Sequence, residues 1–374
     1  MAPFTSINFY LLALIYLVLV MLFKFILKHK HYATFTFLFT FLYLSLYIKF
    51  GFSAIAYSIF SYFFIKYWSI RINHKLVSSI ILLIPMLLFK LKVDVPILYF
   101  IGLSFVTFRS IQTNIDYNKK EEFKFIDFFN FLFFIPALLI GPLDRFKEFT
   151  IKCKDGFKTI NFVNIESGFS EFMKGVLYKY VIAEFIYRYW LNDFVFEKDT
   201  VFYFLNDMYA YLFYLFFDFA GYSALACGFS KMIGISIPFN FNKPFLALNP
   251  PEFWQRWHAS LTNWLTDYVF KPAYKWLSGF QSLKKYPITK QNLAIFLTLF
   301  IMGCWNGFEP QYIYSGLIYA LYSIIHNIYT IECRKKQKDV IFGTIGLKYT
   351  RYISLFLLFN FTAFALYVFS GRCL

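Results

Sequence analysis

Apolar runs recur along the whole chain and constrain its fold more than any other feature. The first covers residues 8–27, and about 20 apolar residues in a helix span the hydrocarbon core of a membrane. Only 16% of the residues are charged, against roughly 25% in soluble domains. Because a backbone in lipid must satisfy its own hydrogen bonds, such runs form helices. The sequence therefore predicts an all-α, polytopic membrane protein.

We expect about ten or eleven spanning or re-entrant helices, arranged as a single membrane-embedded domain over residues 1–374. No internal repeat, low-complexity tract or domain boundary interrupts the pattern. Residues 151–164 are polar and resemble a soluble connector. The remaining apolar runs are 33–48, 54–68, 76–89, 96–108, 125–140, 169–190, 201–217, 293–304, 312–329 and 353–368.

The chain is basic, with a formal net charge of +16. Lysine-rich cytoplasmic loops and contact with anionic membrane lipids explain such a charge in a membrane protein. Lys28 and Lys30 follow the first run, which predicts a cytoplasmic loop there and an outer N-terminus. A basic cytoplasmic face that docks an acidic partner is the alternative interpretation. Nucleic-acid binding would need a basic soluble module, and the sequence contains none.

Metal and disulfide chemistry have little support in the sequence. The five cysteines are scattered and odd in number, so they offer neither a disulfide framework nor the paired spacing of a zinc site. The histidines form no H-E-x-x-H motif. We expect no protein metal site and no bound cofactor.

The stretch from Asn249 to Lys271 is predicted to be one amphipathic helix. Pro250 and Pro251 favour a helix start, because the first helical position needs no backbone donor. Three tryptophans then fall on one face at helical spacing, and His258 lies at the edge of that face. In a soluble chain His258 would most simply be a core histidine. Ionisable residues inside membranes are costly, however, which favours a functional role for His258.

Two further segments carry polar groups into apolar surroundings. Asp218 lies between Phe217 and Phe219 in an apolar run, so its carboxylate must face protein or water. Residues 239–245 lead irregularly into the tryptophan-rich stretch. Irregular backbone at membrane depth is tolerated only inside protein or beside a cavity.

Four segments together resemble a known family. The pattern F-W-x-R-W-H-x-S-L-x-x-W-x-x-D-Y at residues 253–268 resembles the signature of the membrane-bound O-acyltransferase (MBOAT) family. Residues 141–145, 218–223 and 240–245 are similar to the branch that attaches D-alanine to teichoic acids, with the alginate O-acetyltransferases as near relatives. The resemblance covers about residues 102–322.

The resemblance implies acyl transfer inside a central funnel of helices. A carrier protein would dock from the cytoplasm and present its acyl group, D-alanyl in this branch, as a phosphopantetheine thioester. The acceptor would be a hydroxyl of lipoteichoic acid or a similar envelope polymer. The family also implies a multi-pass protein of the bacterial cytoplasmic membrane, and some members act with a small partner peptide.

The resemblance also implies a set of site residues. His258 and position 306 would be catalytic, and Trp254, Trp257, Trp305 and Asp218 would contact substrate. This chain departs from the family pattern at three places. Trp-His-Gly reads Trp-Asn-Gly at 305–307, Gly-Leu-Tyr-His reads Gly-Leu-Ile-Tyr at 316–319, and Arg-Asp-Tyr reads Thr-Asp-Tyr at 266–268. Asn306 thus occupies the position of the family's catalytic histidine.

Asparagine forms hydrogen bonds but is not a base at neutral pH, so three accounts of Asn306 compete. In the first, it is an introduced, inactivating substitution. In the second, it is natural divergence, with His258 or another group as base. In the third, the chain is a catalytically inactive relative, called the silent relative below, that binds carrier or lipid. His326 could replace the missing histidine, and Cys304 could act as a nucleophile.

The sequence leaves two further functions open. An O-acetyltransferase of an envelope polysaccharide would need the same catalytic groups. A transporter or lipid flippase would suit a buried Asp218, but the chain lacks the inverted halves expected of many carriers.

Overall fold

The computed structural model describes residues 4, 7–26, 31–49, 51–69, 75–95, 98–192, 200–336 and 347–373. Throughout these ranges the regular structure is helical, apart from one isolated antiparallel bridge between Phe241 and Trp257. The predicted all-α class is therefore confirmed. Lys28 and Lys30, which define the predicted first cytoplasmic loop, lie outside the described residues.

Two compact units make up the structure. The first contains residues 1–179 and 219–239, and the second contains residues 180–218 and 240–374. Helix α10 (Val201–Met232) supplies its first part to the second unit and its remainder to the first. The single domain and its central funnel remain predictions.

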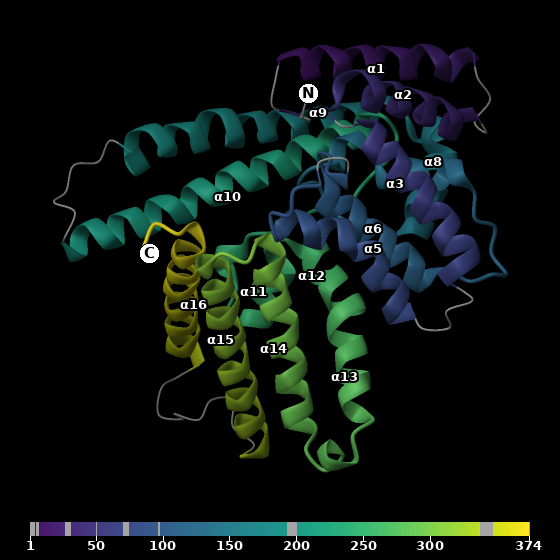
Figure 1. Cartoon of the computed structure of the whole chain (residues 1–374). Helices are drawn as coiled ribbons and strands as arrows, with labels where there is room; N and C mark the ends of the chain where they lie inside the picture. The colour runs from purple at the N-terminus through teal and green to yellow at the C-terminus, as the bar shows by residue number, and fades with distance from the viewer. Residues whose placement is uncertain are drawn as a thin grey trace. The chain divides into compact units, whose positions relative to one another are not determined.

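The first unit packs its helices around α2 and α7, which contact each other and also share α3 and α8 as neighbours. The prediction of a soluble connector at residues 151–164 is wrong, because helix α8 extends to Thr159. Phe149, Cys153 and Phe157 are buried at four-residue spacing, so this polar segment forms a helix with one apolar face. The helices of this unit are α1 (Ile7–Ile26), α2 (Tyr32–Tyr47), α3 (Gly51–Phe63), α5 (Lys75–Lys90), α6 (Leu103–Asp116), α7 (Phe125–Leu132), α8 (Phe146–Thr159) and α9 (Phe162–Val176) (Figure 1).

The predicted helix over residues 125–140 is wrong beyond Leu132, where α7 ends. Pro136 cannot donate a backbone hydrogen bond, and a short 3-10 turn (Ile135–Ala137) follows instead. The buried guanidinium of Arg109 donates to the carbonyl oxygens of Leu132 and Ala137, both at 2.7 Å. Arg109 therefore satisfies one carbonyl group at the end of α7 and one in the 3-10 turn.

In the second unit, helices α13 to α16 lie side by side in chain order (Figure 1). Helices α14 and α15 approach so closely that a Cβ on Gly303 would lie 2.6 Å from the carbonyl oxygen of Tyr312 and 3.0 Å from Gly316 Cα. Only glycine fits at such a backbone approach. The helices of this unit are α11 (Pro250–Arg256), α12 (Ala259–Leu265), α13 (Lys271–Ser278), α14 (Pro287–Asn306), α15 (Pro310–Lys335) and α16 (Leu347–Ser370), besides the first part of α10.

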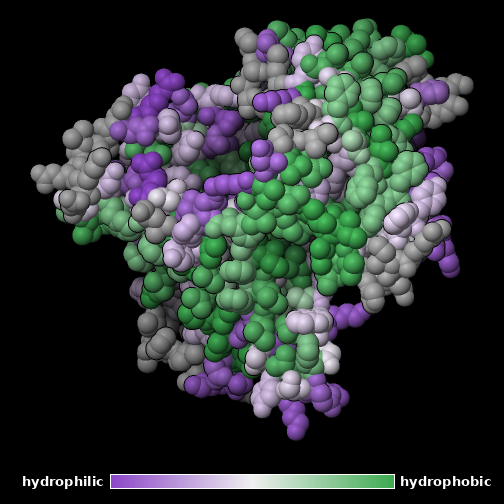
Figure 2. All heavy atoms as spheres, in the orientation of Figure 1, coloured by the Kyte–Doolittle hydropathy of each residue, from purple (hydrophilic) through white to green (hydrophobic). Residues whose placement is uncertain are grey.

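Four of the described helices are long and apolar enough to cross a membrane, by length and composition: Asn8–Ile26, Val201–Met232, Pro287–Asn306 and Tyr349–Ser370. In Figure 2, hydrophobic side chains cover much of the visible flank of α13 to α15, whereas hydrophilic side chains gather at the end where α13 connects to α14. Exposed Lys284 and Lys285 lie in that connection. This pattern suits helices that enter a bilayer from a charged surface.

Candidate active site

The tryptophan-rich stretch begins as the sequence predicts, because its first helix, α11, starts at Pro250. The Asn249 side chain accepts a hydrogen bond from the backbone nitrogen of Glu252 at 2.9 Å. The Glu252 carboxylate in turn accepts one from the backbone nitrogen of Leu248 at 2.8 Å. These contacts satisfy donors that a helix start leaves unpaired.

The predicted continuous helix over residues 249–271 is wrong at Trp257 and His258. Helix α11 ends at Arg256, Trp257 is extended, and His258 takes a left-handed conformation with φ 48° and ψ 45°. A new helix, α12, then starts at Ala259. Non-glycine residues are uncommon in this region of backbone space, and such residues cluster at functional sites.

Backbone pairing with the segment 240–242 causes this break. The backbone nitrogen of Asn242 donates to the carbonyl oxygen of Arg256 at 2.9 Å, and that of Ala259 donates to the carbonyl oxygen of Asn240 at 3.0 Å. The Asn240 side chain also accepts from Ser260 Oγ at 2.6 Å. These bonds replace helical ones between residues 256 and 259. Phe and Asn alternate over residues 239–242, a two-residue period typical of extended chain. This alternation is the sequence feature that could have predicted the pairing.

The break places the buried ring of His258 beside Trp305. The two ring centroids lie 6.4 Å apart with planes inclined by 72°, and His258 is 6% exposed. His258 lies outside the four candidate spans. Burial lowers its pKa to about 3, because removing water disfavours the charged ring. The imidazole is therefore neutral at physiological pH.

Asn306, the last residue of α14, follows Trp305 directly and is half-buried. Its amide Nδ2 donates to the carbonyl oxygen of Met302 at 3.2 Å. The two segments predicted to carry catalysis, at 258 and at 305–306, thus come together at the C-terminal end of α14.

One of the predicted substrate-contacting residues, Trp257, packs in the core instead. Trp257 is 5% exposed and packs against Phe216, Phe241 and Phe253 at centroid distances of 6.1, 5.1 and 5.6 Å, so it is a core residue. Asp218 is half-buried in α10. It follows Phe216 by two positions, about 200° around the helix, and therefore projects from the face opposite the Trp257 contact.

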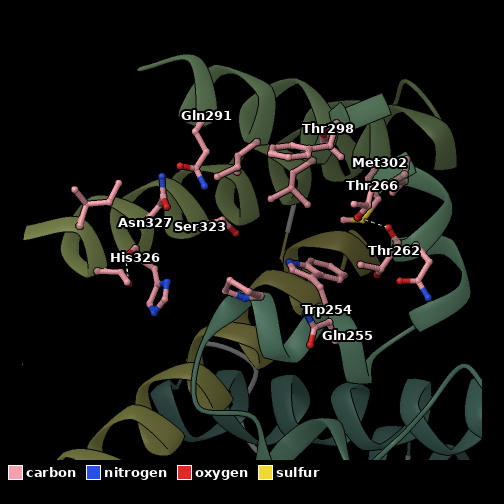
Figure 3. A pocket seen from close by; sticks show the side chains of 18 of the residues that line it. Trp254, Gln255, Thr262, Thr266, Gln291, Thr298, Met302, Ser323, His326 and Asn327 are labelled. Atoms are coloured by element: carbon pink, nitrogen blue, oxygen red, sulfur yellow. Dashed lines mark hydrogen bonds between the residues drawn. The ribbon is translucent and has the colours of Figure 1, made fainter. Parts of the chain in front are cut away.

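Trp254 instead lines a cavity of about 480 Å³ within the second unit (Figure 3). The walls come from α11, α12, α14, α15 and the π-helical turn Thr266–Phe270, and π-helical turns are frequent at functional sites. Met302 lies at one end of the lining, one helical turn before Asn306, and Arg334 at the other. Sequence reasoning did not single out Ser323 or Asn327, which also line this cavity.

The register of α14 against α15 places His326 away from Asn306. Asn327 Nδ2 donates to Asn292 Oδ1 at 2.7 Å, and Gly316 lies against Gly303. His326 is therefore about 15 Å of helical rise beyond Gly316. This separation disfavours His326 as a replacement for the missing histidine, although it lines the cavity.

Comparisons with known proteins agree with these motifs. The sequence pattern of the membrane-bound O-acyltransferase family matches residues 9–337. The chain belongs to this family. This MBOAT protein is 32% identical to the teichoic acid D-alanyltransferase of Bacillus subtilis over 73% of its own length and 69% of the relative's. It is 31% identical to the teichoic acid D-alanyltransferase of Streptococcus thermophilus over 84% and 80%.

Another relative, matched over a shorter stretch, is the peptidoglycan O-acetyltransferase of Helicobacter pylori, 33% identical over 56% of this chain and 39% of the relative. The family assignment made from the motifs is thereby confirmed. It identifies a membrane O-acyltransferase.

Proposed function

We propose that this MBOAT protein transfers an acyl group, D-alanyl, from a carrier-protein thioester to a hydroxyl of lipoteichoic acid or a similar polymer. Its place would be the cytoplasmic membrane of a bacterium. Similarity to two teichoic acid D-alanyltransferases over more than two thirds of both chains supports the reaction. The names of these relatives supply the D-alanyl group and the teichoic-acid acceptor. The carrier and its phosphopantetheine arm are implied only by the resemblance of the motifs.

The observation that carries the proposal is the contact between His258 and Trp305, because it unites the two family motifs. In the reaction, the acceptor oxygen attacks the thioester carbonyl carbon, the C–S bond breaks, and the thiolate leaves. A base must accept the hydroxyl proton, which then passes to the leaving sulfur. The neutral, buried imidazole of His258 lies beside Trp305. Trp305 directly precedes position 306, where the family pattern has its catalytic histidine.

We further propose that Asn306 impairs this transfer. Its amide can orient a hydroxyl or hold water but cannot accept a proton at neutral pH. General base catalysis typically contributes about 10²–10⁴-fold to a rate. The protein with Asn306 would then transfer slowly while retaining its fold and its carrier binding.

Carrier docking is proposed at the basic end of α13 to α15. Exposed Lys275, Lys284, Lys285 and Arg334 lie there, and Arg334 also lines the cavity. An acidic carrier would be steered to this end by charge, an effect that salt screens over about 8–10 Å at 0.10–0.15 M. Association with the carrier should therefore slow as salt rises, and Lys284→Gln with Lys285→Gln should slow it at low salt. An association rate independent of salt would point to a mainly apolar docking surface.

The test of the function is acyl transfer from a D-alanyl-loaded carrier to a teichoic-acid hydroxyl. Asn306→His should raise the rate by about 10²–10⁴-fold, whereas Asn306→Gln, a control that restores size without basicity, should not. Equal, substantial transfer by the unsubstituted protein and by Asn306→His would assign the role of base to His258. Absence of transfer by both, with carrier binding intact, would support the silent-relative interpretation.

O-acetyl transfer is a second candidate, favoured by the similarity to an O-acetyltransferase at 33% identity. The same assay with an acetyl-loaded donor separates the two. Faster transfer of acetyl than of D-alanyl would replace the first proposal.

A further inference from the structure

The turn between α14 and α15 holds a carboxylate close to Asn306. Gly307 directly follows Asn306, and Glu309 is the half-buried residue that precedes α15. A Cβ on Gly307 would lie 2.2 Å from Glu309 Oε2. Since a Cα–Cβ bond is about 1.5 Å long and consecutive Cα atoms are about 3.8 Å apart, Glu309 Oε2 lies within about 7.5 Å of Asn306 Cα. The carboxylate is thus next to the position where the family pattern has its catalytic histidine.

Glycine at position 307 gives the Glu309 side chain this place. The backbone of Gly307 has φ 164° and ψ 177°, an extended conformation that any residue adopts, so space is what glycine contributes here. The same Cβ would also lie 2.9 Å from two ring carbons of Tyr312. A side chain at 307 would therefore displace the Glu309 carboxylate, the Tyr312 ring or both.

Two sources of negative charge meet in this turn. The carboxylate of Glu309 is one, and its position at the N-terminus of α15 favours the ionised form. The other is the C-terminal end of α14, where the last carbonyl groups of a helix carry a partial negative charge. A carboxylate has about four acceptor positions, so Glu309 can bind a ligand cation in addition to a donor from the protein. The turn therefore favours a cationic group beside position 306.

The acyl groups of the two candidate reactions differ in this respect. D-alanyl carries an amino group on the carbon next to the reacting carbonyl, and α-amino groups titrate near pH 7.7–8.0. Most of the D-alanyl groups are therefore ammonium cations at neutral pH. An acetyl group has no charge and gains nothing from a carboxylate nearby.

We infer that Glu309 is a specificity-determining residue, which binds the α-ammonium of the D-alanyl group while its carbonyl reacts beside position 306. The inference rests on the proposed function and adds to it the residue that selects D-alanyl over acetyl. Glu309 takes no part in proton transfer. Its contribution is a charge-assisted hydrogen bond to the donor, a bond that is stronger than one between neutral groups.

The experiment compares two donors of the same shape, carrier loaded with D-alanyl and carrier loaded with isobutyryl, in which a methyl group replaces the ammonium. In the Asn306→His background, Glu309→Gln should lower kcat/KM for D-alanyl roughly 10–100-fold, the loss expected for a hydrogen bond to a charged group. Its kcat/KM for isobutyryl should stay unchanged, and Glu309→Asp should keep part of the preference for D-alanyl. Glu332→Gln is the matched control, because Glu332 pairs with Lys335 at 2.7 Å and lies about 34 Å of helical rise from Glu309 on α15.

Binding gives a second readout that does not depend on turnover. The unsubstituted protein in nanodiscs is titrated calorimetrically with the same two carriers, each with the thioester sulfur replaced by nitrogen. It should bind the D-alanyl form more tightly, and Glu309→Gln should abolish that difference. Equal losses for both donors in Glu309→Gln would indicate a structural role and overturn the inference, while leaving the proposed function intact. Failure of every variant to bind or use either carrier would refute the proposed function and the inference with it.

Discussion

The imidazole of His258 lies 6.4 Å from the indole of Trp305, measured between ring centroids. This contact joins the break between α11 and α12 to the C-terminal end of α14, where Asn306 follows. The left-handed backbone of His258 aims its ring there. A residue in an ordinary helix at this position would project elsewhere, so the contact with Trp305 depends on the break.

Replacing His258 should reduce transfer without unfolding the protein. Asn is the suitable substitute, because Asn also tolerates the left-handed conformation. In the Asn306→His background we expect His258→Asn to lower kcat/KM for the loaded carrier by about 10²-fold or more. Thermal unfolding should show the fold intact. Undiminished kcat/KM would assign His258 a purely structural role.

Lowering the pH should reduce the stability that the neutral His258 ring contributes. Its pKa is lowered by burial to about 3, whereas an unfolded histidine titrates near 6.5, so the unfolded chain takes up the proton first as pH falls. The contribution is complete above about pH 6.5 and declines from there toward pH 3. The wild-type unfolding temperature should therefore fall relative to that of His258→Asn between pH 7 and pH 4. A difference that is constant with pH would contradict a buried neutral ring.

Asn240 should be essential for the local geometry at the break. Its side chain accepts from Ser260 Oγ at 2.6 Å in a fully buried position. Asn240→Ala leaves that hydroxyl without its acceptor, at a cost of about 1–3 kcal/mol. Chemical denaturation in detergent measures the loss. Asn118→Ala is the control, since Asn118 is exposed and its side chain accepts a local bond from the backbone nitrogen of Lys120 at 3.2 Å. Its effect should stay within about 0.5 kcal/mol.

Arg372 should anchor the chain end to α10. Its guanidinium donates to both carboxylate oxygens of Asp207 at 2.9 Å, and the Tyr367 hydroxyl donates to the same carboxylate at 2.9 Å. Because Asp207 is buried, Arg372→Met should destabilise the protein by about 3–5 kcal/mol, leaving a buried charge uncompensated. Adding Asp207→Asn should recover most of that loss. A double variant as unstable as Arg372→Met would show that packing, and not charge, sets the cost.

Local chemistry accounts for what the sequence alone determined. The apolar runs require helices in lipid, and Pro250 with the caps around it starts α11 where the sequence predicted. The motif around His258 and its partner at 305–306 also stood in the sequence, so the family followed from them. Each of these depends on neighbouring residues or on a spacing along the chain.

Only the tertiary structure decided the geometry of the site. Helical spacing favoured an unbroken helix through His258, yet hydrogen bonds with Asn240 and Asn242, which lie outside the predicted helix, break it. Helix propensity is worth less than about 1 kcal/mol per residue, so backbone bonds and burial from distant segments override it.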